Sequence, residues 1–297
     1  MYPKLNSLLT LYARKGAFKS LRQSAFRKFC RHNKGQTMLI DCVDQFRMEV
    51  VIGDSVDNKI AVYREYEPST GYIIRHLAPL SSAFVDVGCN IGYFSCLYGT
   101  YKNSSLIVSI DPNPEMTKRT VINLEKNGLN AGITVNCGIG EKPGKIDLHI
   151  PSYRHSLASL AYVPNRGGET RSIEVPVITL DQIAYEHSIQ NAILKIDTEG
   201  FESRVMQGLT PKYLNSFSYI VCEMSAPHLK SAGQSIEQML SMPIMKNMRC
   251  FLISDEHTPK LFEVSSEEIT SRPTFNENVL FIPEHTKMPQ PLTHLLN

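Results

Sequence analysis

The stretch Phe84–Gly92, with the sequence FVDVGCNIG, decides the fold class. Its apolar start is typical of a buried strand, and Gly88 and Gly92 allow the backbone to turn tightly and to approach a ligand. The dinucleotide fingerprint G-x-G-x-x-G does not fit, because its second and third glycine positions hold Asn90 and Tyr93. The stretch therefore predicts a nucleotide-like cofactor loop that differs from a dinucleotide cradle.

Apolar runs that suit strands alternate with helical patterns after residue 80. We expect strands at residues 84–87, 106–110, 133–136, 192–196, 219–222, 250–254 and 279–282, and helices at 93–101, 114–127, 202–208 and 235–242. Such alternation is typical of a mostly parallel sheet that helices cover on both faces. The sequence therefore predicts an α/β fold.

Three regions follow one another along the chain. Residues 1–36 form a basic arm with weak helical spacing of its apolar side chains. Residues 37–80 hold an alternating stretch, expected as a hairpin at 37–52, and a helix at 57–80 that starts or breaks near Pro68 and Gly71. Residues 81–297 form the main domain. Its insert at 138–178 contains a tight turn at Gly140–Gly144 and a polar surface loop at Pro164–Arg171.

Charge is unevenly distributed between the arm and the body. Nine of the 31 Lys and Arg residues lie in residues 1–36, which hold no Asp or Glu, so 22 basic residues face 29 acidic ones in the remainder. The arm is a solvated or partner-packed helix, a helix that contacts an anionic membrane surface peripherally, or an organellar presequence. We favour the solvated or partner-packed helix, because the apolar stripe is short. The acidic body without Trp argues against nucleic acid as a partner.

The cysteines and the hydropathy pattern indicate the compartment. Seven scattered Cys residues without a C-x-x-C pair are typical of reduced, buried thiols. The uncharged run Val87–Tyr101 is shorter than the roughly 18 residues of a membrane-spanning helix. The N-terminus also lacks the apolar core of a signal peptide. We expect a cytoplasmic protein, with peripheral membrane contact through the arm as an alternative.

The loop after the first sheet strand suits a cofactor with an amino acid moiety. Asp86 ends the strand, and its carboxylate matches an ammonium group, while backbone N–H groups match a carboxylate. The alternative is a strand–helix turn whose glycines serve packing only.

The next two loops offer further cofactor contacts. Asp111 follows Gly92 by 19 residues, which is the spacing at which an acidic residue binds a ribose diol. The alternative for Asp111 is a helix cap before Pro114. Residues 136–139, with Cys137, either border an adenine ring or form a plain turn.

A fourth segment, Lys195–Glu202 (KIDTEGFE), gathers three carboxylates and a lysine at a strand end. Such crowding is costly for structure alone, because like charges raise one another's pKa. For Asp197 and Glu199 we favour a role in substrate binding or proton removal. For Glu202 the alternative, a residue that favours a helix N-terminus, is serious.

Taken together, these motifs resemble the FkbM family of methyltransferases over roughly residues 60–225. The matching features are FVDVGCNIG, IDPNP with Asn123 and Asn127 in the next helix, VITLD at Val177–Asp181, LKIDTEGFE at Leu194–Glu202 with Val205 and Gly208, IVCEM at Ile220–Met224, and the upstream Tyr66–Pro68. This chain departs from the family at Cys89, where Ala is usual, and at Asp111, where Glu is common.

The resemblance implies a class I Rossmann-like methyltransferase with a mostly parallel seven-stranded sheet, an antiparallel last strand and helices on both faces. It also implies S-adenosylmethionine as the cofactor and O-methylation, commonly of a sugar or polyketide hydroxyl. Carried onto this chain, the expected cofactor contacts are Asp86, Gly88, Asn90, Gly92, Asp111, Asn113 and Cys137, with Glu67 facing the same pocket.

By the same resemblance, Lys195, Asp197 and Glu199 line the reacting centre. Methyl transfer to a hydroxyl gains from a base, for which we rank Asp197 first, Glu199 second and His155 of the insert third. No cluster of His, Cys and Asp has metal-ligand spacing, so we expect no metal. The acceptor is expected to be a small molecule or a glycan.

Three alternatives to this enzyme stay open. The fold can serve as a non-catalytic binding module, the protein can methylate nucleic acid, or it can be a nicotinamide-dependent dehydrogenase. The failed G-x-G-x-x-G pattern argues against the last of these.

Overall fold

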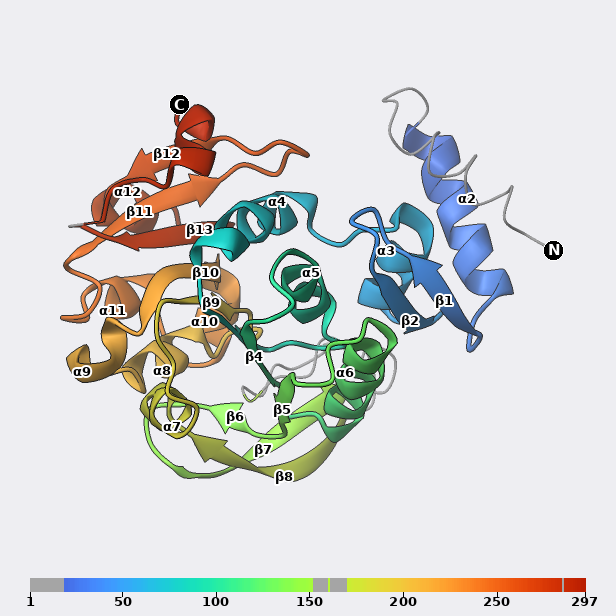
Figure 1. The fold of residues 1–297 in the computed structure, drawn as a ribbon, viewed down its shortest axis with the longest axis horizontal. Coiled ribbons are helices and arrows are strands. Elements are labelled where there is room, and N and C mark those ends of the chain that lie inside the picture. Colours follow the sequence, from blue (N-terminus) through green and yellow to red (C-terminus); the bar gives the residue numbers. More distant parts are fainter. Residues whose placement is uncertain (1–18, 152–159, 161–169, 285) are drawn as a thin grey trace.

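A computed structural model of the chain describes residues 19–151, 160, 170–284 and 286–297. Its centre is an eight-stranded sheet, which is flanked by helices in Figure 1. In spatial order the strands are β12 (Leu261–Val264), β11 (Met248–Ile253), β13 (Asn276–Pro283), β10 (Phe217–Ser225), β9 (Ala192–Ile196), β3 (Ala83–Val87), β4 (Leu106–Ile110) and β5 (Ile133–Val135).

Strand directions confirm the expected α/β class. From β5 to β10 all neighbours pair in parallel, and β13 lies antiparallel between β10 and β11. This is the class I methyltransferase arrangement, with the antiparallel last strand inserted between β10 and β11. The expected number of seven strands is wrong, because β12 pairs with β11 as an eighth strand. With four residues at the sheet edge, β12 is too short to give a periodic apolar signal.

Apolar side chains on both faces of the central strands explain the helical layers. Every residue of β3 and of β9 is buried. Phe84 belongs to the apolar core on one face, under α4 (Pro68–Leu77), α5 (Tyr93–Tyr101) and α6 (Pro114–Lys126). Val85 belongs to the core on the other face, under α7 (Leu180–Glu186), α8 (Glu202–Gln207) and α11 (Ile236–Leu240). Short helices α9 (Pro211–Leu214), α10 (Ala226–Ser231) and α12 (Ser266–Thr270) complete the C-terminal half.

The N-terminal region differs from the expectation at one point. The hairpin is confirmed as β1 (Thr37–Asp41) paired with β2 (Arg47–Val51), and residues 19–32 of the arm form α2 (Lys19–His32). The expected helix at 57–80 is two helices, α3 (Ser55–Tyr63) and α4. Arg64 and Glu67 adopt positive φ angles of 61° and 41°, so the chain leaves the helical path between them.

Helix α2 packs on the N-terminal region, as Figure 1 shows. The rings of Phe26 and Tyr63 stack with centroids 5.8 Å apart, and Phe29 and Cys30 contact the core. Residues 19–32 thus form the expected helix, and it packs on the body of this chain. Residues 1–18 lie outside the described part of the chain, so membrane contact through the arm stays a prediction.

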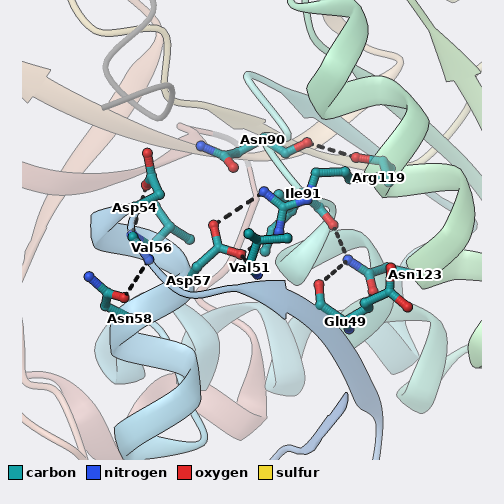
Figure 2. A network of polar contacts seen from close by, with 12 residues as sticks. Glu49, Val51, Asp54, Val56, Asp57, Asn58, Asn90, Ile91, Arg119 and Asn123 are labelled. Atoms are coloured by element: carbon teal, nitrogen blue, oxygen red, sulfur yellow. Dashed lines mark hydrogen bonds and ion pairs between the residues drawn. The ribbon is translucent and has the colours of Figure 1, made fainter. Parts of the chain in front are cut away.

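A polar network fixes the hairpin and α3 against α6 (Figure 2). The buried Asp57 carboxylate pairs with both terminal nitrogens of Arg119 and accepts a hydrogen bond from the Val51 N–H. The Asn123 amide donates to the Ile91 carbonyl at 2.9 Å and accepts from the Glu49 N–H at 2.7 Å. Asn123 therefore joins the loop after β3 to the N-terminal hairpin, which explains an asparagine in the middle of a helix.

The insert holds a second sheet, which the sequence did not predict. β6 (Gly138–Ile139), β7 (Gly144–Pro151) and β8 (Thr170–Ile178) form three strands in the order β6-β8-β7. The Gly140–Gly144 turn connects β6 to β7 as expected. Most of the polar segment at 164–171 lies outside the described residues, and Thr170 and Arg171 belong to β8.

Candidate active site

A pocket lies at the carboxyl ends of β3, β4 and β9, where open parallel sheets bind ligands. It is lined by Ser55, Val56, Tyr66, Val87, Gly88, Cys89, Asn90, Ile91, Tyr93, Phe94, Ile110, Asp111, Pro112, Met116, Cys137, Gly138, Ile139, Leu160, Lys195, Asp197, Thr198 and Glu199. The predicted residues that the structure brings together here are Gly88, Asn90, Asp111, Cys137, Lys195, Asp197 and Glu199. The other predicted site residues within the described ranges lie outside this lining.

Gly88 is required by a close backbone approach. Its φ is +79°, and a Cβ atom at this position would lie 1.8 Å from the Asp197 carbonyl oxygen. The Asp197 N–H in turn donates to the Val87 carbonyl at 3.0 Å. The loop after β3 and the loop after β9 therefore pack directly on each other, which places the expected cofactor loop beside the expected reacting centre.

Asp111 holds two loops in place from inside the pocket. One carboxylate oxygen accepts the Asn90 N–H at 3.0 Å, and the other accepts the Asn113 N–H at 2.8 Å. Burial raises the pKa of Asp111 to about 7, against the lowering effect of these two hydrogen bonds. Each carboxylate oxygen retains a second lone pair, so a ribose diol still finds acceptors here.

Asn113 carries out the capping role that we considered for Asp111. Its side-chain oxygen accepts the Glu115 N–H at 3.0 Å at the start of α6. Its amide nitrogen is buried and has no hydrogen-bond partner in the described part of the chain. Asn113 thus supports the Asp111 loop from behind the pocket lining.

Asp86 is buried below the surface and does not line the pocket. One of its oxygens accepts the Ser95 hydroxyl at 2.8 Å, and that hydroxyl accepts the Ser109 hydroxyl at 2.7 Å. Burial raises the pKa of Asp86, while Lys195 lowers it. Its second oxygen finds no hydrogen-bond partner among the described residues. A direct contact of Asp86 with the cofactor stays a prediction, as does that of Gly92.

Lys195 and Asp197 form an ion pair at the end of β9. The Lys195 Nζ lies 3.1 Å from the Asp197 carboxylate and 4.9 Å from the centroid of the Phe94 ring. Burial alone lowers the pKa of Lys195, but the carboxylates of Asp197, Asp86 and Glu67 raise it overall. The lysine is therefore cationic and holds the Asp197 carboxylate in a fixed position at the edge of the pocket.

The other two carboxylates of the KIDTEGFE segment have separate environments. Glu199, with a positive φ of 56°, pairs with the His228 Nδ1 atom at 3.4 Å. Glu202 is fully buried and accepts hydrogen bonds from the Thr198 N–H, the Thr198 hydroxyl and the Gly200 N–H. Glu202 thus organises the loop that carries Asp197 and Glu199, which agrees with its structural alternative.

Glu223, at the end of β10, is a site residue that the sequence reasoning missed. The Asp197 carboxylate raises the pKa of Glu223, and burial and the carboxylates of Glu199 and Glu67 add to the increase. These surroundings favour the protonated form of Glu223. The pKa of Glu67 is also raised, chiefly by burial and then by the Asp197 charge. The IVCEM motif contained Glu223, but nothing in its spacing linked it to the KIDTEGFE segment.

The N-terminal region supplies a wall of the pocket through residues other than the expected Glu67. Ser55 and Val56 begin α3, and Tyr66 follows it. The Tyr66 ring lies 6.0 Å from both Tyr93 and Phe94, measured between centroids. These aromatic side chains border the pocket near Lys195.

The residues of the pocket fit S-adenosylmethionine. Asp111 offers an acceptor for the ribose, and Ile110, Met116 and Ile139 offer apolar surface for the adenine. The turn at Gly88 brings backbone close to the pocket without a side chain in the way. The pocket thus combines a hydrogen-bond acceptor for a ribose with an apolar surface for a base, as a nucleoside cofactor requires.

Three further predictions concern His155, metal ions and membrane-spanning helices. His155 lies outside the described residues. Among the described residues, no group of three or more His, Cys, Asp or Glu side chains is arranged to hold a metal, and independence from metals stays a prediction. No helix in the described ranges has the length and apolar character needed to cross a membrane.

Comparison with known protein families decides the assignment. The family model described as the methyltransferase FkbM domain matches residues 86–249. The chain belongs to the FkbM methyltransferase family. The expected family is thereby confirmed.

Two curated relatives resemble this FkbM domain over part of their length. Hexuronic acid methyltransferase AglP of Haloferax volcanii is 25% identical over 142 residues, which are 48% of this chain and 55% of that protein. Methyltransferase 1 of Beauveria bassiana is 24% identical over 165 residues, which are 49% of this chain and 66% of that protein. The matched parts cover less than two thirds of either relative.

Solved structures resemble the chain more distantly. An O-methyltransferase from Bacillus cereus, solved in complex with SAH, has a TM-score of 0.40 and 10% identity over 74% of this chain and 82% of that chain. A superposition at this score is too loose to bear on substrate or mechanism.

Proposed function

We propose that the protein is an S-adenosylmethionine-dependent O-methyltransferase that methylates a hydroxyl of a sugar or a related natural product. The observation that carries this proposal is the Asp197 carboxylate, which the buried Lys195 holds at 3.1 Å on the edge of the cofactor pocket. The FkbM family supports the reaction class, and the name of the AglP relative supports a sugar acceptor.

The proposed mechanism is an in-line displacement. The bound cofactor supplies an electrophilic methyl group. Asp197 would accept the proton of the acceptor hydroxyl as the hydroxyl oxygen takes the methyl group from the cofactor, which would leave as S-adenosylhomocysteine. Glu223 lies beside Asp197, and the Asp197 carboxylate and burial raise the pKa of Glu223. Placing the oxygen in line supplies about 7–11 kcal/mol of barrier reduction.

Replacement of the proposed base tests this mechanism. Asp197→Asn keeps the shape of the side chain but removes its basicity, so we expect turnover to fall by roughly 10²–10⁴-fold. Binding of S-adenosylmethionine, measured by calorimetry, should stay nearly unchanged. Asp147→Asn, an exposed substitution on β7, is the matched control and should leave both quantities as they are.

Two results would count against the proposal. Loss of cofactor binding in Asp197→Asn would assign Asp197 to the cofactor instead of to the proton. Failure of the wild-type protein to methylate any member of a panel of glycans and small hydroxyl compounds, despite cofactor binding, would favour a non-catalytic binding module.

A further inference from the structure

A second cavity, of about 890 Å³, lies next to the cofactor pocket. Its walls come from the link between α3 and α4, the end of β10, and residues at the ends of β11 and β13. Tyr66 lines both cavities, so they share a wall. The volume is in the range of cavities that hold small organic ligands.

The shared wall places the reacting carboxylates between the two cavities. Glu67 and Glu223 line the second cavity, and Asp197 lines the cofactor pocket. The parallel pairing of β10 with β9, with Cys222 opposite Ile196, puts Glu223 next to Asp197 across the two strands. The Asp197 charge raises the pKa of Glu67 and of Glu223, in agreement with this placement. A hydroxyl of a molecule in the second cavity therefore lies beside Glu67 and Glu223, at the wall that separates it from Asp197.

The second cavity has a surplus of acidic side chains. Five carboxyl groups line it, from Glu65, Glu67, Glu223, Asp255 and Glu277. Burial and neighbouring carboxylates raise the pKa of Glu67 and of Glu223, so the repulsion of an anionic ligand comes chiefly from the exposed Asp255 and Glu277 at the rim. The basic lining residues are Lys59 and His257. The His257 ring lies 2.9 Å from the Glu65 carboxylate, and the Lys59 Nζ lies 5.2 Å from the centroid of the Tyr66 ring.

The lining of the second cavity favours a ligand that carries hydroxyl groups and disfavours one that carries a carboxylate. Carboxylate and amide side chains, including those of Asn276 and Asn278, exchange hydrogen bonds with sugar hydroxyls. Recognition of a bound carboxylate favours an Arg fork, and no Arg is among the lining residues that the structure describes. Like charges across a binding site cost affinity.

We propose that the second cavity is the acceptor site and that it selects an uncharged, hydroxyl-rich glycoside over a hexuronate. The inference rests on the proposed O-methyltransferase function and narrows it. It also separates this chain from the relative whose name specifies a hexuronic acid.

The test compares matched pairs of methyl glycosides: glucoside with glucuronide, galactoside with galacturonide, and mannoside with mannuronide. Binding is read by saturation-transfer NMR in the presence of S-adenosylhomocysteine, so the result does not depend on turnover. We expect a signal from at least one neutral glycoside, and a signal at least tenfold weaker from its uronate partner. Where methyl transfer occurs, kcat/KM should show the same order.

A variant without two rim charges tests whether the cavity causes the preference for neutral glycosides. Asp255→Asn/Glu277→Gln removes two exposed rim charges and should reduce the neutral-to-uronate ratio several-fold, because two repulsive charges are lost. Asp147→Asn/Glu174→Gln removes the same charge from facing positions of β7 and β8, and should leave the ratio unchanged.

Three results would overturn the inference: equal or stronger binding of the uronates, no binding of any neutral glycoside, or an unchanged ratio in the rim variant. Calorimetry with S-adenosylmethionine separates these from failure of the proposed function. A protein that binds the cofactor and no glycoside has a different acceptor, whereas one that does not bind the cofactor is not the proposed enzyme.

Discussion

Asp111 shows how a single buried carboxyl can combine a structural and a binding role. It accepts backbone hydrogen bonds from the loops after β3 and β4, yet burial raises its pKa to about 7. Below that pH the group is mostly protonated and neutral, and above it the group is ionised. An ionised carboxylate is the stronger acceptor for ribose hydroxyls, because charge-assisted hydrogen bonds exceed neutral ones in strength.

We therefore expect the affinity for S-adenosylmethionine to rise between pH 6 and pH 8. Asp111→Asn should remove this increase and weaken binding at pH 8 by about tenfold or more, since a hydrogen bond to a charged group contributes about 1.5–3 kcal/mol. Calorimetry across the pH range measures both effects. An Asp111→Asn variant that retains the wild-type pH dependence would assign the titration to another group.

At the scale of elements, the loops after β3 and β9 depend on each other. The contact of Gly88 with the Asp197 carbonyl leaves no space for a side chain, and the Asp197 N–H bonds to the end of β3. The sequence predicted both loops as site segments, because each follows an apolar strand and carries polar residues. Their mutual contact depends on the β3–β9 pairing across about 100 residues of chain, which no local pattern encodes.

Gly88→Ala should therefore be strongly destabilising. The added Cβ would overlap the Asp197 carbonyl oxygen, and Ala is strained at a φ of +79°, so we expect a loss of about 3 kcal/mol in the free energy of unfolding. Gly144→Ala is the matched control, since no atom lies within 4 Å of its added Cβ, and should change stability by less than about 0.5 kcal/mol. Urea denaturation of both variants measures the difference, and equal stabilities would contradict this account of the loop contact.

At the scale of the whole molecule, the cofactor pocket is assembled from distant regions. Ser55 and Tyr66 come from the N-terminal region, Asp111 from the middle of the sheet, and Asp197 from the second half of the chain. The ion pair between Asp57 and Arg119 and the bridging amide of Asn123 hold the N-terminal region against the central domain (Figure 2). A ligand in this pocket contacts all of them and so stabilises the folded chain as a unit.

S-adenosylmethionine should accordingly raise the stability of the whole protein. At a concentration 100 times its dissociation constant, a ligand that binds only the folded state adds about 2.7 kcal/mol, which corresponds to several degrees in Tm. NAD should cause no shift, because the G-x-G-x-x-G pattern is absent. Thermal unfolding with each cofactor measures the change in Tm. A rise in Tm with NAD alone would favour the dehydrogenase alternative.

The sequence alone determined the fold class and the site segments that are local in the chain. Apolar strands between helices predict a covered parallel sheet, and a polar residue directly after a strand must lie at its carboxyl edge. Long-range proximity decided the rest. The edge strand β12 and the sheet of the insert depend on pairing partners, and Glu223 acquires its raised pKa only where folding places it beside Asp197. Pairing and burial act between residues that are distant in sequence, so only the tertiary structure reveals the wall formed by the N-terminal region and the acidic cavity behind it.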